Sequence, residues 1–212
     1  MKQNKRLKIM KTLKEHVLNN SKEYIVVTLI FVIGVFLGVL FVNNMQETQR
    51  VEIDTYLNNF INKFKEIDNI DNIGLLKESI SEKILLAVGI WFFGTTVIGI
   101  PVVFGIVLYR GFCFGYTISV CVSILGMSKG LIFVLTSLFL QNILFIPAIL
   151  ALSVSGFKLY KSIIKNKEKE NIKIEILRHT IFSFIMLIVL IISSIVETFV
   201  SSNILKAIIK YF

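Results

Sequence analysis

Long apolar runs alternate with short polar segments along the chain. The uncharged runs cover residues 24–42, 84–109, 112–127, 131–157 and 180–200, the last one only if Glu197 lies inside it. A transmembrane helix needs about 20 mostly apolar residues, and a helix pairs all its backbone polar groups within its own segment. The pattern therefore predicts an all-α, polytopic integral membrane bundle of about five transmembrane helices, with residues 1–212 as one domain.

The third apolar run is the least secure of the five. It covers only residues 112–127 and is separated from the run before it by Arg110 and Gly111 alone. A re-entrant hairpin is therefore an alternative to a full span. Without a third span, however, the basic segment 158–179 would lie outside the cell, which contradicts the positive-inside rule. Five full spans are the preferred prediction.

Composition and charge agree with a membrane protein and orient it. The 212 residues are 55% hydrophobic and only 17% charged, with a mean hydropathy of +0.77, which is too apolar for a water-soluble domain of this size. Most of the 23 Lys and Arg residues lie in the N-terminal tail and in segment 158–179. The positive-inside rule then places the N-terminus in the cytoplasm and the C-terminus outside. We expect membrane lipid around the bundle and no nucleic-acid partner.

The one sizeable extracytoplasmic segment, residues 43–82, contains an amphipathic pattern. Leu57, Phe60, Ile61 and Phe64 recur at helical spacing, with polar residues on the other faces. These four residues predict a helix outside the membrane. Such a helix would lie flat on the outer leaflet, cap the bundle, or bind a partner protein.

Pairs of glycines occur at the spacing that lets two helices approach closely. Gly34 and Gly38 form a GxxxG motif in the first span, and Gly111 and Gly115 repeat it near the third. Two roles stay open for Gly34 and Gly38. They either pack against another helix of the same chain or bind a partner helix, which includes a second copy in a homodimer.

The fourth span carries polar groups near the middle of the membrane. Gln141 and Asn142 are adjacent, and Pro147 follows at a position that frees the carbonyl of Ile143. We expect this helix to bend where these groups cluster. An interhelical clamp is the simpler role, and a substrate pathway is the alternative.

Two ionisable residues stand out near the ends of predicted spans. Glu197 is placed in the outer quarter of the fifth span, where an unpaired carboxylate is costly, and Lys83 and Lys129 are its candidate partners. Proton or ion handling and simple exposure to outside water are the alternatives. Arg110 is placed at the cytoplasmic surface, where it would reach lipid headgroups. His179 is expected at the same interface.

The sequence contains no recognisable catalytic or metal-binding pattern. H-E-x-x-H, G-x-S-x-G, P-loop and C-x-x-C motifs are absent, and a Ser and His pair within the spans is not apparent. Cys113 and Cys121 lie in one apolar run and are expected to be small buried residues. We therefore expect no catalytic residues, no metal, no cofactor and no enzyme activity.

Several stretches together resemble the stage II sporulation protein M family of endospore-forming bacteria. They are G-T-T-V-I-G-I-P-V-V-F-G at 94–105, R-G-F-C-F-G at 110–115, L-Q-N-I-L-F-I-P at 140–147 and V-E-T-F-V-S at 196–201. The five-span layout agrees, so the resemblance covers nearly the whole chain.

The resemblance implies a particular role. A member of this family would be a multi-pass protein of the cell membrane, at the asymmetric sporulation septum and the engulfing mother-cell membrane. There it would be a scaffold that recruits two single-span peptidoglycan-degrading enzymes, stage II sporulation proteins P (amidase and endopeptidase) and D (lytic transglycosylase). The alternative is a permease-like subunit of a small-molecule or lipid transporter, which Pro101, Pro147, Gln141 and Glu197 would suit.

Overall fold

The computed structural model describes residues 20–66, 71–165 and 169–209, and all regular structure there is helical. The predicted all-α class is therefore confirmed. The basic residues of the N-terminal tail up to position 19 lie outside the described residues, as does the centre of the predicted loop 158–179. The helices are α2 (Ser21–Asn43), α3 (Glu47–Glu66), α4 (Asn72–Gly94), α5 (Ile100–Leu125), α6 (Met127–Val134), α7 (Leu140–Lys165), α8 (Lys169–Val196) and α9 (Ser202–Ile208). Two π-helical segments, η1 (Leu135–Phe139) and η2 (Glu197–Ser201), join α6 to α7 and α8 to α9.

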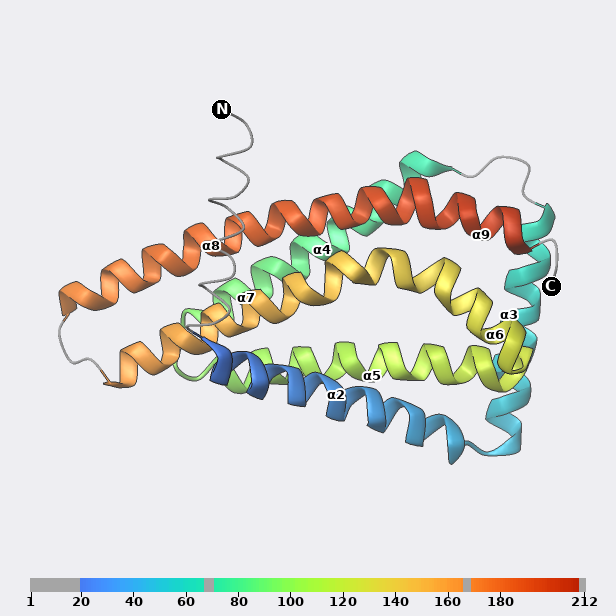
Figure 1. Ribbon diagram of the computed structural model, residues 1–212, viewed down its shortest axis with the longest axis horizontal. Coiled ribbons are helices and arrows are strands. Elements are labelled where there is room, and N and C mark those ends of the chain that lie inside the picture. The colour runs from blue at the N-terminus through green and yellow to red at the C-terminus, as the bar shows by residue number, and fades with distance from the viewer. Residues whose placement is uncertain (1–19, 67–70, 166–168, 210–212) are drawn as a thin grey trace.

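The long helices run side by side along the length of the molecule (Figure 1). Four helical stretches are long and apolar enough to cross a membrane: Ser21–Asn43, Ile100–Leu125, Asn142–Ile164 and Ile172–Ile208. The fifth long helix, α4, packs against α7 and α8. Its first half carries Lys77, Glu78, Glu82 and Lys83, so by composition alone it does not qualify as a span.

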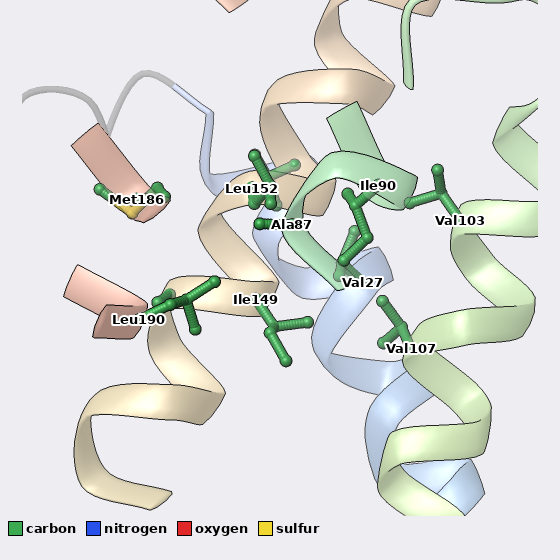
Figure 2. Close-up of a cluster of buried hydrophobic side chains, with 11 residues drawn as sticks. Val27, Ala87, Ile90, Val103, Val107, Ile149, Leu152, Met186 and Leu190 are labelled. Carbon is green, nitrogen blue, oxygen red and sulfur yellow. The ribbon is translucent and has the colours of Figure 1, made fainter. Parts of the chain in front are cut away.

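The core is built where the five long helices meet. Val27 of α2, Ile90 of α4, Val107 of α5, Leu152 of α7 and Leu190 of α8 are all fully buried. Figure 2 shows their side chains converging from these helices. Because lipid tails are as apolar as these side chains, the core gains its energy from close packing rather than from escape from water.

The glycine pairs bring α2 and α5 into backbone contact. A Cβ atom at Gly34 would overlap the carbonyl oxygen of Leu108, and one at Gly38 would overlap that of Phe112. Gly111 and Gly115 meet the backbone of α2 in the same way. The face with Gly34 and Gly38 is therefore occupied by α5, and the predicted partner-binding role of these two glycines is wrong. They pack within the chain.

Helix α3 stands across the end of the bundle at which α6 and α9 lie (Figure 1). Leu57 and Ile61 are buried against Cys121, Phe133 and Leu205. Of the three roles open for this amphipathic helix, the structure shows the cap. Leu57 and Ile61 are used inside the chain and do not bind a partner, whereas Phe60 is 37% exposed and Phe64 is partly buried beside it.

The second and third apolar runs are divided at a different place from the predicted one. The chain leaves the helix after Gly94 and re-enters it at Ile100, so the break covers 95–99 and not Arg110 and Gly111. Thr95 and Thr96 turn their hydroxyls back onto the carbonyls of Phe92 and Phe93. Pro101 lies in the first turn of α5, where its missing N–H costs nothing.

The helices also extend beyond the predicted apolar runs. Residues 72–82, predicted as part of the outer segment, form the first half of α4, and most of the predicted loop 158–179 belongs to α7 and α8. Polar and charged residues are compatible with helix at the ends of spans, where water is near, and deeper in the bundle where they find partners.

Candidate functional site

Four charged side chains from three helical segments form two ion pairs. Lys83 Nζ of α4 lies 2.6 Å from Glu197 Oε2 of η2, so one of the two partners expected for Glu197 is confirmed. Arg110 of α5 donates to Glu82 Oε1 of α4 at 2.8 Å. The Lys83 side chain is only 7% exposed and that of Glu197 34%.

These charges lie near the middle of the bundle, not at its ends. Arg110 is about 15 Å along the axis from the start of α5, which is half the thickness of a hydrocarbon core. The next residue, Gly111, packs on Phe31, near the middle of the apolar run of α2. The predicted positions of Arg110 at the cytoplasmic surface and of Glu197 in the outer quarter are therefore corrected to about mid-depth.

Hydroxyl groups complete the environment of the buried ion pair. Ser79 donates to Glu197 Oε2 at 2.6 Å, and Lys83 Nζ lies 3.4 Å from Ser193 Oγ. A buried charge in hydrocarbon is tolerated only when its hydrogen-bonding capacity is met. Helices α4 and α8 are thereby tied together by polar contacts at the same depth.

The ring of Phe145 from α7 lies close to both cations. Lys83 Nζ is 5.5 Å and Arg110 Cζ is 5.6 Å from its centroid, within the range of a cation–π contact. Next to it, Asn142 donates to the carbonyl of Leu138 at 2.7 Å. The side chain of Gln141 lies outside the described residues.

Both π-helical segments border this site. The side chain of Asn142 donates to the backbone carbonyl of Leu138, which lies in η1. Glu197 is the first residue of η2, and Ser202 donates to its backbone carbonyl. Figure 1 shows the rod of α6 and α7 bending in this region. The predicted bend is present, but a π-helix adjoins it, and Pro147 continues inside α7. π-Helical turns are frequent at functional sites, because they redirect a side chain without ending the helix.

A cavity of about 160 Å³ lies between α4, α5 and α7 and is bordered by these groups. It is lined by both ion pairs together with Cys113, Phe114, Thr117, Leu138, Asn142 and Phe145. The volume is sufficient for several water molecules or for the end of a polar side chain. Among the described side chains, no three His, Cys, Asp or Glu residues converge as a metal ligand set would.

A second polar contact, His179 with Ser155, was not predicted by the sequence. His179 is 2% exposed rather than interfacial, its Nδ1 lies 2.9 Å from Ser155 Oγ and its Nε2 lies 3.4 Å from the carbonyl of Trp91. The closely packed Gly94 and Gly156 leave room for the ring. Because Ser155 is also buried, we assign this pair to holding α4, α7 and α8 together.

Sequence reasoning found part of this site. It named Lys83 as one of two candidate partners of Glu197, and it placed Asn142 near mid-membrane. These three residues line the cavity. It missed Glu82, which it assigned to the outer segment, and it placed Arg110 at the cytoplasmic surface instead of at mid-depth. The signal that would have found both is G-T-T-V-I-G-I-P, where a Gly, two Thr and a Pro mark a turn.

The fold and the two ion pairs define a polytopic helical membrane protein with charged side chains paired near the middle of its bundle. A family model described as stage II sporulation protein M matches residues 27–202. The chain belongs to this family and is a sporulation-related, multi-pass membrane protein. The family is not a known enzyme family. No curated protein and no solved structure matches the chain.

Proposed function

We propose that this chain is a non-enzymatic membrane scaffold of the engulfment machinery. In this proposal it lies at the asymmetric septum and in the engulfing mother-cell membrane, and it recruits stage II sporulation proteins P and D to the septal peptidoglycan. The observation that carries the proposal is the family match, which covers residues 27–202 and includes all four stretches on which the resemblance rests. A homodimer is a further expectation.

The cap helix α3 offers a surface that suits this role. Tyr56 is 74% exposed and Phe60 37% exposed, one turn apart on the edge of the helix next to its buried face. In the predicted orientation this end of the bundle faces the cell wall. Exposed aromatic side chains are frequent in the centres of protein interfaces. We therefore assign Tyr56 and Phe60, with the partly buried Phe64, to binding the outer parts of the wall enzymes.

The test is recovery of the two wall enzymes with a tagged chain from sporulating membranes. Phe60→Glu and Tyr56→Glu are expected to reduce recovery strongly while leaving the amount of inserted chain unchanged. Asn62→Glu is the matched control, because Asn62 is exposed on the opposite side of α3. Equal recovery with Phe60→Glu and Asn62→Glu would show that α3 is not the binding surface. Failure of the unaltered chain to recover either enzyme would contradict the scaffold.

The charged cavity favours a second candidate function, a permease-like transporter subunit. Intramembrane ionisable residues beside a cavity are typical of ion and proton pathways. Purified chain in liposomes loaded with a pH-sensitive dye would then conduct protons faster than empty liposomes, and Glu197→Gln would abolish the difference. Liposomes with and without the chain that behave alike would exclude proton conduction.

A further inference from the structure

The outward edge of α4 carries a charge where lipid is expected. The side chain of Glu82 is 60% exposed, although it lies at about the same depth as Arg110. Arg110 donates to Oε1 of Glu82, and the rest of this carboxylate is exposed next to the cavity. A charged group facing hydrocarbon near the bilayer centre costs several kcal/mol, so a polar group is expected to cover it.

Two turns further along the same edge, α4 has space for a close neighbour. Gly89 lies on the stripe of Glu82 and Leu85, and apart from the backbone of its own helix nothing lies within 4 Å of the position that its Cβ would occupy. Leu85, between them, is 75% exposed. Glycines that pack two helices of the chain together, such as Gly34 and Gly38, have the backbone of the second helix against them, and Gly89 does not. An open glycine beside a polar residue is the pattern with which transmembrane helices associate.

The cavity lies directly behind this stripe. Glu82 and Arg110 line it together with Cys113, Thr117 and Asn142, and the Glu82 side chain is 60% exposed. Its size fits the end of one side chain, and its lining offers carboxylate and hydroxyl acceptors. A hydrogen-bond donor that enters from the α4 side would therefore reach Glu82 first.

We propose that the stripe Glu82, Leu85 and Gly89 binds a transmembrane helix of a partner protein. The backbone of that helix would approach at Gly89, and a donor side chain at mid-membrane depth, basic, amide or hydroxyl, would bond Glu82. This inference rests on the proposed function, because the partner it names is a single-span wall enzyme bound to the scaffold. A second copy fits less well, since the same stripe on that copy would bring another carboxylate, an acceptor, against Glu82, and its Arg110 already donates to its own Glu82.

The test is site-specific photo-crosslinking in full-length chain co-expressed with the two wall enzymes. Replacing Leu85 with p-benzoylphenylalanine is expected to give an adduct between the chain and a wall enzyme on irradiation. The same replacement at Phe36, which is 61% exposed on α2, should give none.

A matched pair of glycine variants separates binding from folding. Gly89→Leu fills the open space without touching the rest of the chain, so the protein should insert and fold while the adduct falls by about tenfold. Gly105→Leu is the control, because Gly105 also has open space around it but lies on the exposed side of α5. The adduct should be unchanged in Gly105→Leu.

The outcomes distinguish the inference from the function on which it rests. If the wall enzymes co-purify but position 85 gives no adduct, or if Gly89→Leu crosslinks as well as the unaltered chain, the stripe is not the binding site and the scaffold stands. An adduct of the chain with itself would assign the stripe to a second copy and overturn the inference. If the unaltered chain recovers no wall enzyme, both proposals fall.

Discussion

Arg110 of α5 donates a hydrogen bond of 2.8 Å to Glu82 of α4, although the apolar pattern places these residues at opposite ends of a single span. The contact exists because the chain turns back at 95–99, which brings the two residues to the same depth. The ion pair therefore joins the two arms of an antiparallel helical hairpin. Arg110 and Gly111, which separate two apolar runs in the sequence, lie near the middle of α5.

The position of this turn can be tested by cysteine labelling. In a background of Cys113→Ser and Cys121→Ser, Thr96→Cys should react with a membrane-impermeant maleimide in inverted vesicles but not in intact cells. Thr96 is exposed at the turn, and the predicted orientation places the turn in the cytoplasm. The buried Ile90→Cys is the control and should not react from either side. If Thr96→Cys reacted in intact cells only, the turn would lie outside the cell and the predicted orientation would be wrong.

Removal of one member of the buried ion pair should destabilise the bundle. Lys83→Met leaves Glu197 without its cation, and breaking a buried pair in this way costs about 3–5 kcal/mol. Thermal unfolding in detergent should show the loss, and Lys83→Met combined with Glu197→Gln should recover part of it. Lys77→Met, at an exposed position of α4, should have little effect. Equal stability of Lys83→Met and Lys77→Met would show that the pair contributes nothing.

The close contact of α2 and α5 predicts a strong effect of side-chain size. Gly38→Leu drives a side chain into the backbone of Phe112 and Tyr116, which cannot move aside as a flexible side chain would. Overpacking of this kind costs about 1–3 kcal/mol. Gly105→Leu adds the same side chain in open space and should unfold at the temperature of the unaltered chain. The measurement is unfolding followed by circular dichroism in detergent.

The buried histidine predicts a loss of stability rather than of binding. His179→Ala leaves Ser155 without its partner, and a buried unpaired hydroxyl costs about 1–3 kcal/mol. Arg178→Ala is the neighbouring control, because the Arg178 side chain is 67% exposed and bonds to Glu175 within its own helix. Its effect should stay within about 0.5 kcal/mol. If both variants lowered the unfolding temperature equally, His179 would not have the stabilising role assigned to it.

The sequence was sufficient for the all-α membrane class, because hydropathy measures the same solvent preference that selects helices in lipid. It was also sufficient to predict an ion pair for Glu197 with Lys83 or Lys129, since a carboxylate in hydrocarbon needs a cation, and Lys83 is the partner in the structure. It failed at the boundary between the second and third runs. There the apolar pattern continues through the turn, and only Gly94, Thr95, Thr96 and Pro101 indicate it.

The sequence also could not predict which faces of α2 and α3 pack inside the chain, since this depends on which helices become neighbours. The spacing of Gly34 and Gly38 is the same whether a partner helix or α5 lies against them, and Leu57 has the same pattern in a cap as in a docking helix. His179 sits among basic residues in the sequence, but Gly94 and Gly156 create a space for it inside the bundle.

The ion pair between Lys83 and Glu197 also constrains biosynthesis. Glu197 follows Lys83 by 114 residues, so the ribosome completes α4 long before the counter-ion exists. During that interval a weakly apolar segment with several charges must wait beside the translocon or near the membrane surface, because its insertion alone is unfavourable. The arrival of the C-terminal helix neutralises it. A nascent chain that ends before Glu197 lacks the carboxylate that neutralises Lys83 and so favours insertion of α4.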